Sequence, residues 1–595
     1  MTESLHSLYK SRRDEYASAE DDSRKKARLY ASFRLITAAI IAGSLWQAVA
    51  NPHWWWISLA SGGTLLFVLL VRGHGKYRWK QRYFRRLRRI NEQEIAALNG
   101  QWNQFPSGEV YQDATHPYAL DLDIFGKNSV FQLVNRTATR SGEALLARTL
   151  TTPPADPGLI QERQRAIAEL ASRIDFRQHF LAKGLEGVKE TSGETRQLLH
   201  WLEGPAIPFN TLLMRLARIL LPAGALFLLM LALVGLVPHS AWVLAVLLNL
   251  GITGLFLKPI NRIHAVLSQK HMLLEKFSLL LWDIEQEEFE NETLRALRRK
   301  GTEASRAIGR LTGILGFFDQ RLNFMVGAAL NGFLLSDLQC VAALDRWRFR
   351  YRDQMPGWLD SIFRFEELNS FATYAYNHPG FCYPEFREKP LVASEQMGHP
   401  LMAGPHCVPN DFLPRTEEKV VILTGANMSG KSTFLRCLGV NLVLAYAGAP
   451  VYARKFSCSP AAIWSSMRVT DSLSDNTSYF HAELKRLSRI MERLRAGQKL
   501  VILLDEILKG TNSTDKLHGS TGLVAEFLRH DCLCIIATHD LELGKLEEKH
   551  PVEVSNYCFE STLEENELRF DYRLRKGIAR NKNATFLMRR TGLIK

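Results

Sequence analysis

Two long stretches of the chain contain no Asp, Glu, Lys or Arg. The first covers residues 35–71 and is broken at residues 51–53 (Asn-Pro-His), directly before three tryptophans. The second covers residues 219–257 and has Pro-His-Ser at residues 238–240 near its middle. A membrane-crossing helix needs about 20 mostly apolar residues, and tryptophan favours the membrane–water boundary, so each stretch predicts a helical hairpin that crosses a bilayer twice. The first helix of residues 35–71 is short, which leaves a re-entrant or buried helix pair as the alternative.

Basic residues flank both predicted hairpins and are missing from both turns. Residues 72–89 read RGHGKYRWKQRYFRRLRR, and the second stretch is flanked by Arg215, Arg218, Lys258 and Arg262. The positive-inside rule therefore predicts four spans in the cytoplasmic (inner) membrane, with every sizeable segment between them in the cytoplasm. The basic cluster also suits anionic lipid, and its aromatic residues leave nucleic acid as an alternative partner.

Helical periodicity covers much of the chain outside these stretches. Residues 129–177 and 260–350 have apolar positions at helical spacing. Within residues 260–350, we expect a group of apolar side chains to pack inside this region rather than to bind a cofactor; they are Phe317, Phe318, Leu322, Phe324, Met325, Leu334 and Leu335. The predicted segments are residues 1–90 for a charged N-terminus with the first hairpin, 91–215 for the first helical part, 216–258 for the second hairpin and 259–390 for the remaining helices.

A glycine-rich loop follows a short apolar run in the C-terminal third. Residues 420–423 predict a buried parallel strand, residues 425–432 (GANMSGKS) fit the pattern G-x-x-x-x-G-K-S, and helical spacing follows. This order predicts a phosphate-binding loop whose backbone N–H groups face the phosphates of ATP. Lys431 would reach the β- and γ-phosphates, and the Ser432 hydroxyl would ligate Mg²⁺. The candidate nucleotide-binding residues are Gly425, Ala426, Asn427, Met428, Ser429, Gly430, Lys431, Ser432 and Thr433.

Two further apolar runs end on polar residues that suit ATP hydrolysis. Residues 499–504 lead into Asp505 and Glu506, and residues 532–537 lead into Thr538 and His539. An Asp at the end of a neighbouring strand can hold the metal, and the adjacent Glu is placed to deprotonate the attacking water. His539 is placed to sense the γ-phosphate. The sequence therefore predicts a site that binds ATP with Mg²⁺ and hydrolyses it.

The composition of the chain limits the classes of partner and site that we expect. The chain of 595 residues is long enough for several domains, and its formal net charge of +14 favours anionic partners such as nucleic acid or anionic lipid. The eight cysteines form no C-x-x-C pair, so we expect neither a zinc site nor a disulfide framework, in keeping with a reducing cytoplasm. The first thirty residues are polar and charged, so no cleavable signal peptide is expected.

These motifs resemble, in type and order, those of the MutS family of DNA mismatch-repair ATPases, a branch of the ABC-type P-loop proteins. The resemblance is strongest from Gly398 to the C-terminus, and a weaker one covers residues 129–203. The segments that carry it are His399-Pro400, 408–411 (VPND), 424–433, 471–483, Asp505-Glu506, Gly510-Thr511, Asp515, 537–539 and 572–577 in the first part, and 135–139, Gly142, Leu150, Pro153 and 163–164 in the second. It implies a lever-like helical region in front of an ABC/MutS-type α/β P-loop ATPase domain, here residues 391–595.

The resemblance also implies a mechanism. In such ATPases two nucleotide domains pair head to tail, and this chain carries one set of motifs, so a homodimer is implied. Ser478 in the signature segment would face the γ-phosphate held by the other copy. Glu506 would be the general base, His539 the γ-phosphate sensor, and Asp505 with Ser432 the Mg²⁺ ligands, with a further phosphate contact from Asn427. ATP binding would close the pair, hydrolysis would release it, and the helices would carry the movement outward.

The sequence departs from the family pattern at several places. Ala426 stands where proline is usual, and Asn476, Leu508 and Lys516 stand where glycine is usual. Asn tolerates the left-handed backbone better than most residues, so the turn at Asn476 can survive. No counterpart of the family's mismatch-reading domain, its Phe-x-Glu wedge or its DNA-clamping domain is evident. Any DNA binding should then be mostly to phosphates and steeply salt-dependent.

Two functions of different classes fit these observations. The first is a membrane-anchored MutS-like ATPase that binds DNA and changes its grip with ATP. The second is an ATP-driven conformational switch at the membrane whose client is a protein or a lipid rather than DNA. An ABC transporter is disfavoured, because no charge inside the predicted spans marks a substrate path.

Overall fold

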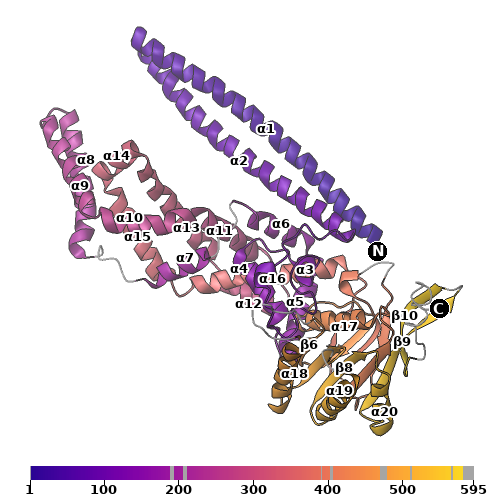
Figure 1. The fold of residues 1–595 in the computed structure, drawn as a ribbon. Helices are drawn as coiled ribbons and strands as arrows, with labels where there is room; N and C mark the ends of the chain where they lie inside the picture. Colours follow the sequence, from indigo (N-terminus) through magenta and orange to yellow (C-terminus); the bar gives the residue numbers. More distant parts are fainter. Residues whose placement is uncertain are drawn as a thin grey trace. The chain divides into compact units, whose positions relative to one another are not determined.

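The computed structural model describes nine parts of the chain: residues 2–187, 190, 193–204, 211–389, 391–402, 407–468, 479–508, 512–564 and 567–579. The chain divides into two compact units, each built from segments that are separated in the sequence (Figure 1). Unit 1 comprises Met1–Asn99, Thr137–Glu143 and Arg173–Glu366, and unit 2 comprises Gly100–Arg136, Ala144–Ser172 and Glu367–Lys595.

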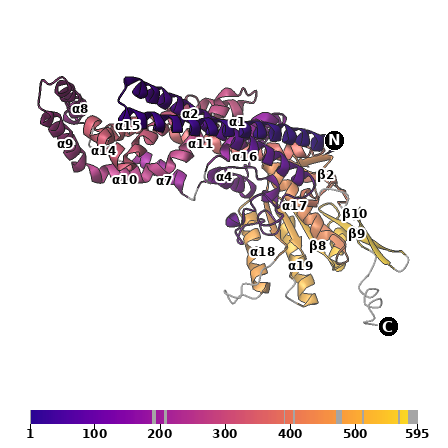
Figure 2. The ribbon, with the colours of Figure 1, turned by 90° about the horizontal axis from the view of Figure 1, so that it is seen from above.

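Unit 1 contains a long antiparallel helical hairpin. Helix α1 (Thr2–Ala50) and helix α2 (Trp54–Leu98) lie side by side in both views (Figures 1 and 2). The helices break at residues 51–53, where Pro52 lacks the N–H that a continuing helix needs. Toward the polar ends of the two helices, Tyr16 of α1 and Leu87 of α2 are buried together with α6 (Ile174–Gly184). The apolar half of the hairpin, in contrast, exposes large side chains such as Trp46 and Leu65.

A second, shorter hairpin follows in the same unit. Helix α8 (Leu212–Leu233) and helix α9 (His239–Leu255) are joined by a short connection. Helix α9 bends by 67° into α10 (Leu257–Leu267). Among the described residues, α1, α2 and α8 are each long and apolar enough to cross a membrane, and the number rises to five if each of two bent helix pairs is one span. The second bent pair is α14 (Phe324–Leu334) with α15 (Ser336–Tyr351).

The other helices of unit 1 form a packed bundle. They are α7 (Glu194–Glu203), α11 (His271–Gln286), α12 (Glu292–Lys300), α13 (Ala304–Phe318), and parts of α4 (Arg140–Thr151) and α16 (Met355–Asn377). Phe318 and Leu335 are buried, as the helical pattern predicts, whereas Phe317 and Leu334 are exposed, contrary to the prediction. The prediction that Leu322, Phe324 and Met325 pack inside the region is wrong, because these side chains are 73%, 85% and 80% exposed. They lie at the junction of a 3₁₀ turn (Asp319–Leu322) and α14, where the chain reverses and leaves them uncovered.

A buried carboxyl group anchors the start of α4. Glu366 accepts hydrogen bonds from the backbone N–H groups of Ala138 and Thr139, each at 3.0 Å, and from the Thr139 hydroxyl. Burial raises the pKa of Glu366 to about 7, although these hydrogen bonds oppose the rise. The negative charge of the neighbouring Glu190 raises the pKa of Glu366 further.

This raised pKa predicts a stability that depends on pH. The folded state holds the Glu366 proton up to about pH 7, whereas the unfolded chain loses it near the ordinary glutamate pKa of 4.5, so the stabilisation is full below pH 4.5 and is lost as the pH rises through about 7. We expect the free energy of unfolding to fall by up to about 3 kcal/mol between pH 5 and pH 8 relative to Glu366→Gln. Unfolding temperatures of both proteins in detergent across this range measure the effect. The exposed-site variant Glu292→Gln is the control, and parallel pH curves for wild type and Glu366→Gln would contradict the assignment.

Unit 2 is built on a six-stranded sheet with the order β10-β9-β4-β8-β7-β6. The strands are β4 (Val420–Gly425), β6 (Ala462–Ser466), β7 (Leu500–Asp505), β8 (Cys532–Thr538), β9 (Val554–Glu564) and β10 (Glu567–Lys576). All neighbouring pairs are parallel except β10 with β9. Strands β4, β7 and β8 are therefore adjacent and end at the same edge of the sheet.

Helices cover the sheet and a second sheet completes unit 2. Helices α18 (Tyr479–Arg495) and α19 (Ser513–Leu528) share a buried apolar core with alternate residues of β4, β7 and β8. Helix α17 (Lys431–Tyr446) approaches β7 so closely that a Cβ on Gly439 would lie 3.0 Å from Leu503. The second sheet has the order β1-β5-β2-β3 and consists of β1 (Glu385–Phe386), β2 (Val392–Met397), β3 (Asn410–Phe412) and β5 (Lys455–Cys458).

Candidate nucleotide-binding site

A tight loop connects β4 to α17. Gly425 and Gly430 have φ angles of 155° and 108°, and a Cβ on Gly425 would lie 2.8 Å from the carbonyl oxygen of Phe559. Met428 also has a positive φ of 67°. The loop can therefore form only because glycine stands at its two ends, and it turns its chain directly into the N-terminus of α17 at Lys431.

The Lys431 side chain folds back over this loop. Although it carries an ammonium group, Lys431 is only 5% exposed. Its Nζ donates hydrogen bonds to the carbonyl oxygens of Gly425, at 2.7 Å, and Ala426, at 2.9 Å. These acceptors are neutral, and a charged phosphate oxygen forms a stronger hydrogen bond with an ammonium group than a carbonyl does. The geometry therefore presents a buried positive charge that an anion can recruit.

The carboxyl ends of β7 and β8 supply the acidic groups beside this loop. Asp505 is the last residue of β7, and the backbone N–H of Glu506 donates to the carbonyl of Ala537 in β8 at 2.8 Å. Nδ1 of His539 lies 3.2 Å from Oε1 of Glu506. Glu506 adopts a φ of 55°, which is uncommon for a residue with a side chain.

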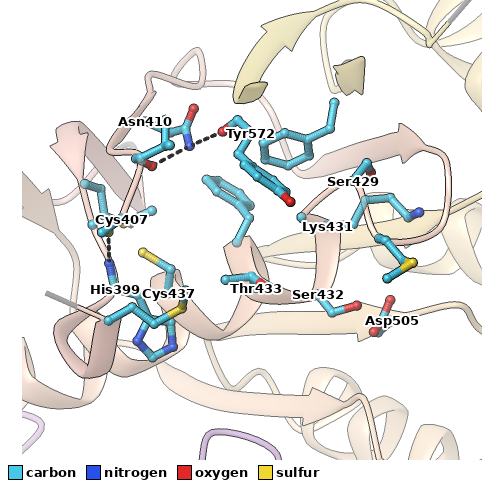
Figure 3. A pocket seen from close by; sticks show the side chains of 18 of the residues that line it. His399, Cys407, Asn410, Ser429, Lys431, Ser432, Thr433, Cys437, Asp505 and Tyr572 are labelled. Atoms are coloured by element: carbon cyan, nitrogen blue, oxygen red, sulfur yellow. Dashed lines mark hydrogen bonds between the residues drawn. The ribbon is translucent and has the colours of Figure 1, made fainter. Parts of the chain in front are cut away.

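One cavity of about 770 Å³ joins most of the predicted site residues (Figure 3). Its lining includes Asn427, Met428, Ser429, Gly430, Lys431, Ser432, Thr433, Asp505 and Glu506. Gly425 and Ala426 contact it indirectly, through their hydrogen bonds to Lys431. His539 reaches the site through Glu506 rather than by lining the cavity. Ser478, together with Asn476, lies outside the described residues.

Leu508 stands where the family usually has glycine, and its backbone adopts the left-handed conformation that glycine favours. Its φ is 59°, and its backbone N–H donates to Oε1 of the buried Glu483 at 2.6 Å. Such a conformation costs a residue with a side chain roughly 1 kcal/mol or more. The Leu508 side chain is itself buried in the core shared with α18 and α19, and this burial offsets the strain. Lys516, the other residue at a usual glycine position, lies in the first turn of α19.

The opposite wall of the cavity was not assigned a role from the sequence. It is formed by Met397, His399, Cys407 and Cys437. Figure 3 shows His399, Cys407 and Cys437 at the end of the cavity opposite to Lys431, Ser432 and Asp505. Burial lowers the pKa of His399 to about 4, so its ring is neutral at physiological pH, and Nδ1 accepts the backbone N–H of Leu401 at 3.2 Å. This end of the cavity is therefore mostly apolar and uncharged, in contrast to the end at Lys431.

Asn410 holds Tyr572 over the cavity. Asn410 Nδ2 donates to the Tyr572 carbonyl at 3.0 Å, and its Oδ1 accepts the backbone N–H of Leu574 at 2.6 Å. The pairing of β10 with β9 is irregular between Phe570 and Leu574, and Tyr572 has a φ of 55°. Its half-exposed ring lies so near the loop that a Cβ on Gly430 would be 3.3 Å from it. The irregular pairing thus places the Tyr572 ring in the lining of the cavity, where it is available to stack on a planar base.

Tyr572→Ala is expected to weaken ATP binding by roughly 3–10-fold, because a stacked aromatic pair contributes about 0.5–1.5 kcal/mol beyond its buried area. Tyr572→Phe keeps the ring and should bind ATP like wild type. Titration calorimetry of the purified chain in detergent measures both dissociation constants. Equal loss of affinity in the Phe and Ala variants would show that the hydroxyl, and not the ring, matters.

Two parts of the chain match models of known domains. Residues 118–218 match MutS domain III, and residues 421–588 match MutS domain V. The chain is similar to proteins named DNA mismatch repair protein MutS from Thermotoga maritima (29% identical over 222 residues) and Thermotoga neapolitana (33% over 223 residues). It is also 30% identical over 234 residues to the mouse MutS protein homolog 4. These matches cover 36–38% of the chain and only 24–27% of the relatives, so the chain spans about a quarter of their length.

Proposed function

Since the chain belongs to the MutS family, we propose that it is a membrane-anchored ATPase that binds and hydrolyses ATP to switch a dimer between two conformations. The observation that carries this proposal is the meeting of Lys431, Ser432, Asp505 and Glu506 at one cavity. A buried ammonium, a glycine-bounded turn of backbone at a helix N-terminus and two carboxylates are the groups that phosphoryl transfer needs.

The donor set fits ATP and Mg²⁺. The loop and the N-terminus of α17 offer N–H groups to phosphate oxygens, and Lys431 adds a positive charge. The Ser432 hydroxyl and the Asp505 carboxylate are oxygen ligands of the kind that Mg²⁺ prefers. When bound, Mg²⁺ would neutralise charge on the phosphates. Glu506 would take the proton of the attacking water, and His539, at 3.2 Å, would orient the Glu506 carboxylate.

The dimer rests on the family mechanism. The chain has one glycine-rich loop of this type, and in the family each nucleotide is completed by the signature segment of a second domain. We assign Ser478 of the other copy to that role. ATP binding would close the homodimer and hydrolysis would release it.

The two hairpins would anchor the protein in the cytoplasmic membrane. Their helices expose large apolar side chains along α1, α2, α8 and α9, which water disfavours and lipid does not. Arg and Lys residues gather at both ends of the hairpins and are missing from their turns, which favours an ATPase part in the cytoplasm. Cell fractionation followed by a carbonate wash tests the anchor: the proposal expects the protein to stay with the membranes, and release by the wash would contradict it.

DNA is the client that the family and the net charge of +14 favour. Binding through phosphates would weaken steeply with salt. The exposed apolar helices favour a second candidate, a protein or lipid client at the membrane. Titrating DNA into the detergent-solubilised chain at low and moderate salt, while ATP turnover is followed, separates the two. DNA-stimulated turnover at low salt supports the first, whereas DNA-independent turnover without binding supports the second.

A further inference from the structure

The segment around α14 exposes an apolar tip. Residues 322–335 contain no charged side chain, and α14 itself is 11 residues long. Leu322, Phe324 and Met325 form the tip and are almost fully exposed. A water-soluble bundle would bury such a cluster, because burying three large apolar side chains stabilises a protein in water by several kcal/mol. The tip therefore needs an apolar partner.

Helix α14 packs against α9 of the second hairpin. Nδ2 of Asn249 on α9 donates to the carbonyl of Gly332 at 2.7 Å, in a buried position. A Cβ on Gly332 would lie 2.7 Å from Val246, so the helices approach closely because glycine stands there. Phe333 stacks on Trp242, with ring centres 6.1 Å apart. Both views show α14 beside α8 and α9 (Figures 1 and 2). The exposed tip is thus attached to the same element that exposes Leu220, Phe227 and Leu244.

The charged residues at both ends of the segment have partners within unit 1. Nε of Arg321 lies 3.1 Å from Oδ2 of Asp337, and both side chains are largely buried. Nε2 of His264 lies 2.9 Å from Asp319. The Arg321–Asp337 ion pair joins the residue before the tip to a residue after α14. The segment therefore leaves the bundle and returns to it at one place.

The polar groups of the turn that joins α14 to α15 also have hydrogen-bond partners. Leu335 has a φ of 49°, and α15 leaves α14 at an angle of 78°. Oδ1 of Asn331 accepts the backbone N–H of Asp337 at 2.9 Å and the Ser336 hydroxyl at 3.1 Å. This turn lies at the base of the segment, beside Asp337, and its hydrogen bonds are made within the protein.

We propose that the α14 segment is a re-entrant element whose tip contacts the acyl chains of the bilayer. Eleven helical residues span roughly 16 Å, about half of the apolar thickness of a membrane, so the segment enters and returns rather than crossing. The inference rests on the proposed membrane anchor, because its bilayer is the one that surrounds α8 and α9. It adds a lipid-contacting surface that the two hairpins do not include.

Site-specific photo-crosslinking in lipid nanodiscs tests the proposal. A benzophenone amino acid replaces Phe324 at the tip, Phe227 on α8 as the lipid-facing reference, or Leu159 on α5 (Pro157–Ser172) in unit 2 as the water-facing control; all three side chains are exposed, so the fold should tolerate the exchange. After irradiation, intact mass spectrometry should show one added phospholipid at positions 324 and 227 and none at 159.

The outcomes separate this proposal from the anchor on which it rests. Lipid adducts at 227 without adducts at 324 would overturn the re-entrant element and leave the anchor. No adduct at 227 would overturn both. A crosslink of 324 to a second copy of the chain would show that the tip is a protein interface, which also overturns the proposal.

Discussion

Glu506→Gln is expected to lower ATP turnover by at least about 100-fold while ATP still binds. Gln has the size of Glu and can keep the contact with His539, but it cannot take a proton from the attacking water. A general base contributes roughly 10²–10⁴-fold to such reactions. Phosphate release measures the turnover, and calorimetry measures the affinity for ATP. The variant should accumulate in the ATP-bound, closed form of the dimer.

His539→Ala is the matched comparison for this variant. In this account His539 acts through Glu506, so its loss should reduce turnover less than Glu506→Gln does and should shift the pH dependence of turnover. Normal turnover in Glu506→Gln would remove Glu506 from the base role. A larger loss in His539→Ala than in Glu506→Gln would instead make His539 the group that contacts the reacting atoms.

Lys431→Ala is expected to raise the dissociation constant for ATP by about 10–100-fold. A hydrogen bond to a charged group contributes roughly 1.5–3 kcal/mol, and Lys431 would exchange two neutral carbonyl acceptors for phosphate oxygens. The exposed Lys485→Ala on α18 removes the same charge elsewhere in unit 2 and should bind ATP like wild type. Equal affinities in Lys431→Ala and wild type would show that the nucleotide does not bind at this loop.

The parts of the fold that local sequence determines could be predicted. The first hairpin breaks between Ala50 and Trp54, because Pro52 cannot donate the hydrogen bond of a continuing helix. The loop before Lys431 could be located because its glycines, lysine and serine stand at fixed spacing. Asp505 and His539 could be placed beside it, because parallel strands bring their carboxyl ends to one edge of the sheet.

Other features depend on contacts that the sequence does not show. The cavity lining also includes Asn410 and Tyr572, which are far apart in the sequence and whose contact depends on an irregular strand pairing. The motifs around both residues were visible, but no local pattern assigns them to one cavity. The exposed tip at Phe324 could not be predicted either, because a buried helix and a re-entrant one share the same apolar composition.

Phosphate release from ATP by the purified full-length chain, with Mg²⁺, tests the central claim most directly when Lys431→Ala is prepared and assayed in the same way. We predict release by the wild type that requires Mg²⁺ and falls by about 10-fold or more in Lys431→Ala when ATP is kept near the dissociation constant of the wild type. Equal release by both preparations, or none by a wild type that has bound ATP, would contradict it.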